Sequence, residues 1–365
     1  MMYIEDCCEI LDSMRIPITA ENRKEGEYPY YGANGIQGYV DDYIFDGEFV
    51  LLAEDGGNFG SKEKPIAYRI SGKCWVNNHA HVLKPKAGLD VDYLCYSLMF
   101  YKVDGMVNGA TRQKLTQAAM RKMQIPSRSI EEQEYIVDEL NRISKMREQR
   151  KLELKLLDDL IKARFVEMFG DVKHEEKYKG IPLRELCLTM SGGTPSTKNT
   201  EYYEGNIPWI TTVSLGPNHI DGSTAKGYIT QDAIKNSATK LIPAGNILFG
   251  TRVGVGKSSI NDVDICTNQD IIAIIGIDEN KFNRVFIKHV LDNYQPYYDN
   301  LKKGATILGI TSDDLKDTLI PDAPIDVQTE FVAFVEQVDK SKVAIQKSLD
   351  ETQLLFDSLM QKYFG

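Results

Sequence analysis

Apolar residues recur at alternating steps of three and four positions along two long stretches of the chain. The first stripe contains Ile136, Leu140, Ile143, Leu154, Leu157 and Ile161, and the second contains Phe331, Val335, Val338, Ile345, Leu349, Phe356 and Leu359. A heptad stripe of this length is typical of a coiled-coil seam rather than of one face of a surface helix. Just before the first stripe, Ser129 and Glu132 have the spacing of a capping box, which predicts the start of a helix.

The second stripe belongs to a copy of the first. Residues 304–365 align without a gap on residues 109–170, at a constant offset of 195 positions (304 minus 109). The anchors of this alignment are Gly109-Ala110-Thr111 with Gly304-Ala305-Thr306, Ile125-Pro126 with Ile320-Pro321, Gln133 with Gln328, and Phe169-Gly170 with Phe364-Gly365. Only 14 of the 62 pairs are identical, so the argument depends on the hydrophobic register, which is also kept. The chain is therefore predicted to contain two copies of one unit, each a globular segment followed by a long helix.

Polar positions within the stripes predict that the two helices run antiparallel. In a parallel pair Arg147 would face Lys342, and like-charge repulsion disfavours that layer. In an antiparallel pair Arg147 meets Thr352 and Leu157 meets Lys342, so the basic side chains can lie along apolar neighbours and reach water. About 34 helical residues at roughly 1.5 Å each would form a rod of about 50 Å, longer than one DNA turn of about 34 Å.

The segments before the helices mix short strands, turns and one helix each. Residues 49–53 and 271–275 read as strands, and residues 90–101 and 280–301 as mostly helix. This interleaving predicts an α+β fold, with two globular domains in a pseudo-twofold arrangement, separated by two long helices that form an antiparallel coiled coil. The predicted segments are 1–125 and 171–320 for the globular domains and 126–170 and 321–365 for the helices.

Composition restricts the class of protein. No apolar run approaches the roughly 18 residues needed to span a bilayer, and the first residues do not resemble a signal peptide. Six scattered cysteines without a CxxC pair indicate reduced thiols in a cytoplasmic protein. The net charge of -10 argues mildly against nucleic acid, so any DNA binding must use local patches or a partner that supplies phosphate contacts.

Several motifs together resemble the target-recognition domains of type I restriction-modification specificity subunits. In the first segment they are residues 27–36 (Glu-Tyr-Pro-Tyr-Tyr-Gly-Ala-Asn-Gly-Ile) and 41–47 (Asp-Asp-Tyr-Ile-Phe-Asp-Gly). In the second segment they are residues 191–196, 207–212, 241–245 and 267–269. The order Ile-Pro, Glu131-Glu132-Gln133, long helix and Phe-Gly is similar to that family's helical spacers. The second helix start departs from this order, because Asp326-Val327-Gln328 replaces the Glu-Glu-Gln run.

The resemblance implies a non-catalytic subunit that reads DNA. Each globular domain would read one half of a split, asymmetric double-stranded target. The paired helices would set the gap between the halves and dock two modification subunits. The modification subunits bind S-adenosylmethionine and methylate adenine, and two restriction subunits that use ATP are an optional addition, so no cofactor is expected on this chain itself.

Polar side chains on predicted loops are the candidates for DNA contact. In the first domain they are Tyr31, Asn34, Glu54, Asp55, Asn58, Lys62, Asn78 and His79, and in the second Thr194, Thr211, Thr212, Ser214, Arg252, Lys257, Asn268 and Gln269. Amide side chains suit adenine, carboxylates accept from cytosine N4, and arginine suits guanine O6 and N7. For the asparagines the alternative is a turn cap, for the tyrosines core packing, and for Arg252 and Lys257 an ordinary solvated loop.

Aligning the two domains places Glu54-Asp55 opposite Thr251-Arg252. Opposite chemistry at one structural position is what two domains that read different bases require. The stretch from Thr251 to Ser258 also invites comparison with a phosphate-binding P-loop. That motif needs glycine five residues before the Gly256-Lys257 pair, and threonine stands there, so nucleotide binding is disfavoured.

Three competing hypotheses follow from these residues. His79-Ala80-His81 could suggest a metal, but without cysteine or carboxylate at ligand spacing no metal site is expected. A solitary DNA methyltransferase or nuclease is the alternative function. The chain has neither an Asn/Asp-Pro-Pro-Tyr/Phe tetrapeptide nor a convincing Asp…Glu-x-Lys cluster, which argues against both enzymes. A coiled-coil adaptor unconnected with DNA is the remaining alternative.

Overall fold

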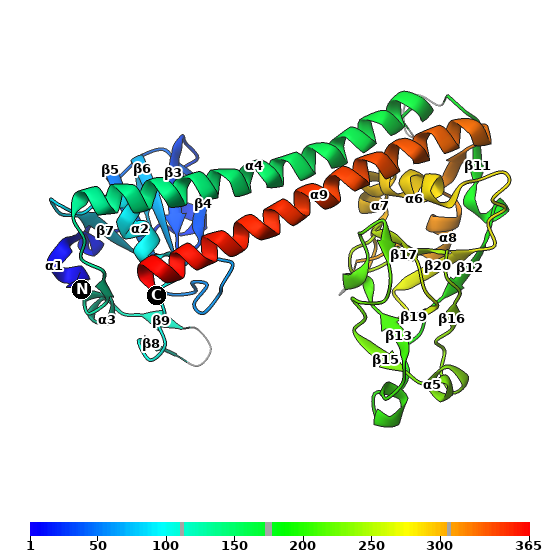
Figure 1. Cartoon of the computed structure of the whole chain (residues 1–365), viewed down its shortest axis with the longest axis horizontal. Helices are drawn as coiled ribbons and strands as arrows, with labels where there is room; N and C mark the ends of the chain where they lie inside the picture. Colours follow the sequence, from blue (N-terminus) through cyan, green and yellow to red (C-terminus); the bar gives the residue numbers. More distant parts are fainter. Residues whose placement is uncertain (110–112, 172–176, 305–307) are drawn as a thin grey trace. The chain divides into compact units, whose positions relative to one another are not determined.

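The computed structural model describes residues 1–109, 113–171, 177–304 and 308–365. The chain divides into two compact units: the first contains Met1–Leu152 and Gln346–Gly365, and the second contains Glu153–Ile345. Figure 1 shows the first unit mainly in blue and cyan and the second mainly in green, yellow and orange. Of the predicted repeat anchors, Ala110, Thr111, Ala305 and Thr306 lie outside the described residues.

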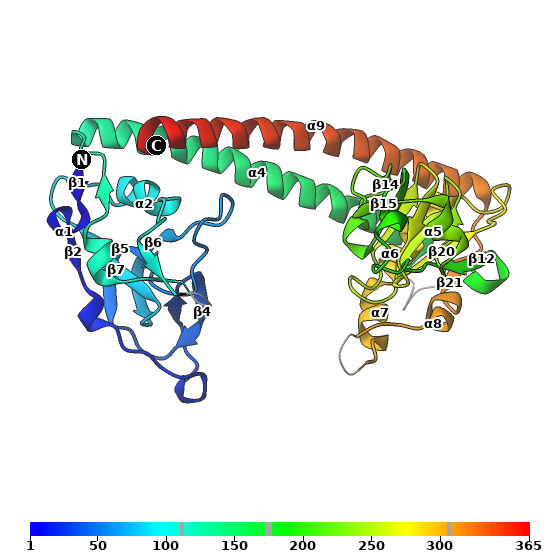
Figure 2. The same cartoon turned by 90° about the horizontal axis from the view of Figure 1, so that it is seen from below.

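A six-stranded sheet in the order β2-β7-β5-β6-β3-β4 forms the centre of the first unit. Its strands are β2 (Cys8–Ile10), β3 (Tyr28–Gly32), β4 (Gly35–Val40), β5 (Phe45–Ala53), β6 (Ala67–Val76) and β7 (Ala80–Pro85). Only β3 and β6 run parallel, and every other pair in the sheet is antiparallel. The helix α2 (Val91–Met99) covers β5, β6 and β7, and Figure 2 shows it between this sheet and the long helix α4 (Ile130–Phe169). The strand predicted over residues 49–53 and the helix predicted over 90–101 are confirmed.

Short elements complete the first unit. They are β1 (Met2–Tyr3), α1 (Ile4–Cys7), η1 (Asp12–Met14), η2 (Ala20–Asn22), β8 (Val107–Asn108), β9 (Lys114–Leu115), α3 (Gln117–Arg121) and β10 (Gln124–Ile125). β1 pairs with β10, and β8 pairs with β9. The Thr116 side chain caps α3 by accepting a hydrogen bond from the backbone N–H of Ala119, as threonine commonly does at a helix start.

The second unit has two main sheets, in the orders β12-β20-β17-β18-β14 and β15-β13-β19-β16. The strands are β11 (Gly180–Pro182), β12 (Leu188–Ser191), β13 (Ile207–Ile210), β14 (His219–Ile220), β15 (Gly227–Ile229), β16 (Leu241–Ile242), β17 (Ile247–Gly250), β18 (Ser258–Asn261), β19 (Ile265–Thr267), β20 (Ile271–Ile275) and β21 (Leu319–Pro321). The helices are η3 (Leu183–Glu185), η4 (Thr200–Tyr203), η5 (Thr212–Ser214), α5 (Gln231–Lys235), α6 (Arg284–Asn293), α7 (Gln295–Leu301), α8 (Ser312–Lys316) and α9 (Ile325–Phe364). The strand predicted over residues 271–275 is β20.

The two units share a core strand topology, to which the second unit adds β14 and β16. In the first unit β5 pairs with β6 and β7, and β6 pairs in parallel with β3. In the second unit β17 pairs with β18 and β20, and β19 pairs in parallel with β13. The long strand β6 is therefore divided into β18 and β19 in the second unit, and this division separates one sheet into two. The common topology confirms the duplication that the sequence predicted.

In the first unit the start of α4 packs antiparallel against the end of α9. The Tyr363 hydroxyl, near the end of α9, donates to a Glu139 carboxylate oxygen at 2.5 Å, near the start of α4. Further along, the guanidinium carbon of Arg147 lies 4.6 Å from the centre of the Phe356 ring. The prediction paired Arg147 with Thr352, whereas the guanidinium group packs on Phe356, one turn further along α9. The reciprocal bonds between Ser129 and Glu132, at 3.0 and 3.3 Å, confirm the capping box at the start of α4.

The second unit pairs the opposite halves of the same helices, again antiparallel. Arg164, near the end of α4, contacts Glu330 near the start of α9 at 2.8 Å. Lys342, which was predicted to face Leu157, contacts the carboxylate of the next residue, Asp158, at 2.6 Å. The charge of this seam lysine is therefore balanced by an ion pair. Each helix has 40 residues, longer than the 34 expected, which at roughly 1.5 Å per residue makes each about 60 Å long. No helix in the described part of the chain is long and apolar enough to cross a bilayer.

One buried glutamine attaches the start of each long helix to its globular part. The Gln133 side chain accepts a hydrogen bond from the Asp90 backbone N–H at 2.9 Å and donates to the carbonyls of Gly88 and Arg128, both at 3.0 Å. Gln328 repeats this arrangement, accepting from Asn283 at 2.9 Å and donating to Lys281 and Ala323 at 3.0 and 2.8 Å. Both glutamines are fully buried. The identity at this pair of positions is therefore explained by one repeated contact.

One phenylalanine attaches the end of each helix to the other globular part. The Phe364 ring, at the end of α9, lies 5.3 Å from the ring of Tyr93 on α2, measured between centroids. The Phe169 ring, at the end of α4, lies 4.7 Å from the ring of Phe286 on α6. Each globular part is thus bound by the start of one helix and by the end of the other. This contact explains the phenylalanine of the repeated Phe-Gly ending.

We predict that Gln133→Ala lowers the stability of the first unit by about 2–4 kcal/mol. The substitution leaves one N–H and two carbonyls buried without partners, and each such group costs about 1–3 kcal/mol, partly recovered by relaxation. Chemical denaturation of the full chain, combined with hydrogen exchange of residues 80–99, measures the effect. Gln149→Ala, an exposed glutamine on the same helix, is the matched control. Equal losses for both variants would contradict the role assigned to Gln133.

Candidate nucleic-acid interface

Loops that follow three strands meet at one edge of each unit. In the first unit the Asn77 N–H donates to the Tyr31 carbonyl at 3.0 Å, and the Glu54 N–H donates to the His79 carbonyl at 2.8 Å. These bonds join the loops after β3, β5 and β6. In the second unit the Asn268 N–H donates to the Ile210 carbonyl at 3.1 Å, and the Thr251 N–H donates to the Asp270 carbonyl at 2.8 Å. The loops after β13, β17 and β19 are joined in the same way.

Backbone bonds also fix which residues of the two units correspond. The Leu115 N–H donates to the Glu54 carbonyl at 2.7 Å, and the Ile310 N–H donates to the Thr251 carbonyl at 2.9 Å. Leu115 and Ile310 are partners in the sequence repeat, so Glu54 corresponds to Thr251, and Asp55 to Arg252. An acidic pair in the first unit therefore stands where the second unit has a threonine and an arginine. The correspondence that the sequence suggested at this position is confirmed.

The first edge cluster, which we define as Tyr31, Asn34, Asp55, Asn58 and His79, contains two hydrogen-bonded pairs, Asn34 with Asn58 and Asp55 with His79. The Asn58 amide donates to the Asn34 side-chain oxygen at 3.1 Å, and the Asn34 amide donates to the Gly56 carbonyl at 2.9 Å. The His79 Nδ1 atom lies 2.5 Å from an Asp55 carboxylate oxygen. The half-buried Tyr31 ring contacts Tyr68, with centroids 6.0 Å apart. Of the other predicted contacts, Asn78 and Lys62 are exposed on the same loops.

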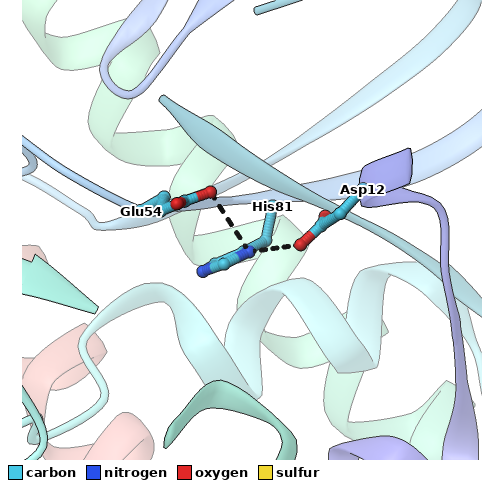
Figure 3. Close-up of side chains that lie close together, drawn as sticks. All are labelled: Asp12, Glu54 and His81. Carbon is cyan, nitrogen blue, oxygen red and sulfur yellow. Dashed lines mark hydrogen bonds and ion pairs between the residues drawn. The ribbon is translucent and has the colours of Figure 1, made fainter. Parts of the chain in front are cut away.

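Glu54 is held inside the first unit by a network of charged side chains, part of which is drawn in Figure 3. Its carboxylate contacts Arg15 at 2.6 Å and Lys114 at 3.0 Å. The His81 Nδ1 atom donates to Asp12 at 2.7 Å, and its Nε2 atom donates to the Leu115 carbonyl at 2.9 Å. Both ring nitrogens thus face oxygen atoms, one from a carboxylate and one from a backbone carbonyl. The network ties the loops that carry Asp12, Glu54 and Leu115 to the sheet.

The carboxylates of this network are held in their charged form. Burial alone would raise the pKa of Asp12, but hydrogen bonds and charge from His81, with Gln117 and the Val82 N–H, hold it below the ordinary value. Burial likewise opposes ionisation of Glu54, and hydrogen bonds from Arg15 and Lys114 outweigh it, so the pKa of Glu54 is also lowered. The predicted base contact through Glu54 would therefore have to compete with two cations that already bind its carboxylate.

Asp12, Glu54 and His81 are also the one group of described residues with ligand atoms close enough for a metal ion, within 4.8 Å of one another. The donor set does not suit a metal site, because Arg15 and Lys114 already bind the Glu54 carboxylate and would repel a third cation. His79, the other histidine of the sequence motif, faces Asp55 instead. The group is best described as an ion-pair network.

The second edge cluster, which we define as Thr194, Thr211, Arg252, Asn268 and Gln269, uses different side chains. The Thr194 hydroxyl donates to the Gln269 side-chain oxygen at 2.6 Å. Asp270 joins Arg252 at 3.4 Å and the Asn268 amide at 3.1 Å. The backbone at Gly192 lies close to that of Asn268. Glycine is needed there, because a Cβ would lie 2.2 Å from the Asn268 carbonyl oxygen. The exposed Lys257 lies on the loop that begins at Arg252.

The loop after β13 differs from the sequence-based expectation. The prediction assigns DNA contacts to Thr212 and Ser214, yet these residues are only 4% and 6% exposed, and the Ser214 hydroxyl donates to the Thr224 carbonyl at 2.7 Å. Val213, which the prediction left out, is 84% exposed. A search for polar residues cannot find such a position. Along η5 the side chains alternate, with Thr212 and Ser214 pointing inward and Val213 outward, and this alternation depends on the backbone conformation of the turn.

These features describe a duplicated recognition scaffold, with two units of one topology and different loop chemistry at the same edge. The chain belongs to the family of type I restriction modification DNA specificity domains, whose profile matches residues 1–156 and 175–352. The family resemblance noted from the sequence is thereby confirmed.

Individual relatives agree with this assignment. A type I restriction enzyme specificity subunit of Haemophilus influenzae is 26% identical over 358 residues, which cover 95% of this chain and 89% of the relative. The EcoR124I/EcoR124II specificity subunit of Escherichia coli is 29% identical over 177 residues, 46% of this chain and 42% of the relative. The crystal structure of the type I S subunit from M. genitalium matches with a TM-score of 0.58 at 15% identity, covering 100% of this chain and 95% of that one, which supports the fold.

We predict that acid destabilises the first unit more than the second. The pKa values of Asp12 and Glu54 are lower in the folded chain than the reference values of 3.8 and 4.5, so the unfolded chain binds protons first. The stabilisation is therefore complete above about pH 5 and is lost as the pH falls through 4 and below. In the second unit Ser191, Thr251 and Ile272 occupy the positions of Asp12, Glu54 and His81.

Hydrogen exchange of β7 and β20 between pH 7 and pH 4, corrected for intrinsic rates, measures this difference within one molecule. We expect loss of protection in β7 with little change in β20, and a smaller loss in Asp12→Asn. An equal loss in both strands would contradict the assignment of the network.

Proposed function

We propose that this chain is the DNA specificity subunit of a type I restriction-modification enzyme, and that each unit reads one half of a bipartite double-stranded target. The observation that carries the proposal is the common topology with different chemistry at corresponding positions, above all Asp55 and Arg252. Two units that share one arrangement of strands but differ in the side chains of their loops suit a protein whose two halves read different sequences. The family profile and the relatives support the same function.

The base contacts follow from the chemistry of the two edge clusters. Arg252 suits guanine O6 and N7, and the exposed Gln269 suits adenine N6 and N7, whereas Asn268 is only 9% exposed and its amide donates to Asp270. In the first unit Asn34, Asn58 and Asn78 offer amides for adenine, and Asp55 offers an acceptor for cytosine N4. Lys62 and Lys257 are assigned to phosphate, where a lysine contributes affinity without sequence preference.

The helices are proposed to set the gap between the half-sites and to dock two modification subunits. Exposed apolar side chains on the helices support docking: Met146, Leu152, Leu354 and Leu355 in the first unit, and Leu156, Leu160 and Val343 in the second. S-adenosylmethionine and the transfer of methyl groups to adenine belong to the modification subunits, and ATP to restriction subunits where these join. This chain is proposed to work in the cytoplasm without catalytic activity of its own.

We predict that the chain, coexpressed with its cognate modification subunit, causes adenine methylation at one bipartite motif. A methylome of these cells measures the outcome, and cells with the modification subunit alone are the control. The purified chain mixed with S-adenosylmethionine and DNA should show no turnover. Turnover without a partner would instead support the enzyme alternative, and methylation without sequence preference would contradict the proposal.

We predict further that replacing residues 181–303 with the corresponding segment of another specificity subunit changes one half of the methylated motif and leaves the other half intact. The segment carries the whole second edge cluster, whereas the first edge cluster lies outside it. A methylome of the chimaera tests this. A change in both halves would show that the two units do not read separately.

A further inference from the structure

Val213 is exposed on the loop that follows β13, and Asn34, a candidate base-reading residue of the first unit, is exposed on the turn that follows β3. The parallel strands pair Tyr31 with Val76 in the first unit and Ile210 with Thr267 in the second. Tyr31 and Ile210 therefore correspond. Asn34 lies in the short turn between β3 and β4, and Val213 lies in η5, within the longer segment between β13 and β14. Both side chains are exposed. The loops after these two corresponding strands thus present an exposed amide in the first unit and an exposed isopropyl group in the second.

The loop around Val213 is fixed on both sides, so the side chain is held outward. The Ser214 N–H donates to the Thr211 carbonyl at 3.0 Å, and the Ser214 hydroxyl donates to Thr224. Leu215 is buried in the core with Ile210, and the N–H of Gly216 donates to the Ser259 hydroxyl at 3.0 Å. An 84% exposed apolar side chain on a loop anchored this firmly is available to a partner without any rearrangement.

We infer that Val213 contacts the 5-methyl group of a thymine in the second half-site. This inference rests on the proposed function. Valine neither donates nor accepts hydrogen bonds, so it cannot read a base edge by polar contact. The apolar feature that the major groove displays is the thymine methyl group, which small apolar side chains contact. Burial of both groups removes apolar surface from water and so favours thymine over a base that lacks the methyl.

The test uses the complex of this chain with its modification subunits and duplexes that contain the methylated motif. Each thymine of the second half-site is replaced in turn by deoxyuridine, which removes the methyl and keeps the base pair. We expect binding to weaken about fourfold at one position, the effect of losing one buried methyl contact. Val213→Ala should reduce this thymine-to-uracil ratio to about one, whereas Val213→Thr, which retains a methyl at the same place, should keep most of it.

Val263→Ala is the matched control, because this valine is 37% exposed in the same unit, before the amino end of β19, whereas the second edge cluster follows its carboxyl end. It should leave the ratio unchanged. The inference would be overturned if every uracil duplex bound as well as the thymine duplex, or if the second half-site contained no thymine. It would also be overturned if Val213→Ala left the thymine-to-uracil ratio unchanged. An equal loss of binding to thymine and uracil duplexes in Val213→Ala would likewise contradict it. If scrambling the second half-site leaves binding unchanged, the proposed function fails as well.

Discussion

The attachment of both long helices to each globular part is the constraint on which the rest of this fold depends. Gln133 binds the start of α4, and Phe364 the end of α9, to the first unit. Gln328 and Phe169 do the same for the second. A polar clamp at the helix start and an aromatic contact at the helix end together fix where each helix leaves its globular part. Both repeats must be present for either unit to be complete, which explains why the repeat keeps an exact register over 62 residues.

Because the strands of each unit are held in a fixed arrangement, the loops at the edge of the sheet can differ between the two units. The strand pairings that position the loops are the same in both units. One unit stabilises its edge with the ion-pair network around Glu54, and the other uses the Thr251 hydroxyl, which donates to the Asp270 carbonyl. Backbone hydrogen bonds do not depend on side-chain identity, so the frame tolerates these substitutions. Different recognition chemistry can therefore arise at one edge without a change of topology.

Much of the fold could be predicted from the sequence, because its signals are local or periodic. The heptad stripes predicted the two long helices, the basic residues Arg147 and Lys342 within them predicted the antiparallel direction, and Ser129 with Glu132 predicted the capped start of α4. The division of β6 into β18 and β19 could not be predicted, since it depends on strand pairing between distant residues. The inward turn of Thr212 and Ser214, and the pairing of Glu54 with Arg15, likewise depend on tertiary contacts. Residue type alone indicated which loops could face DNA, but not which side chains point outward.

The central claim is that the two units read separate halves of one DNA target. Photo-cross-linking tests it most directly, with 5-iodouracil placed in one half of the methylated motif at a time and the cross-linked peptides of the assembled complex identified by mass spectrometry. The account predicts peptides from the first unit with one half and peptides from the second unit, including the loop around Val213, with the other. Cross-links from both halves to the same unit would contradict it.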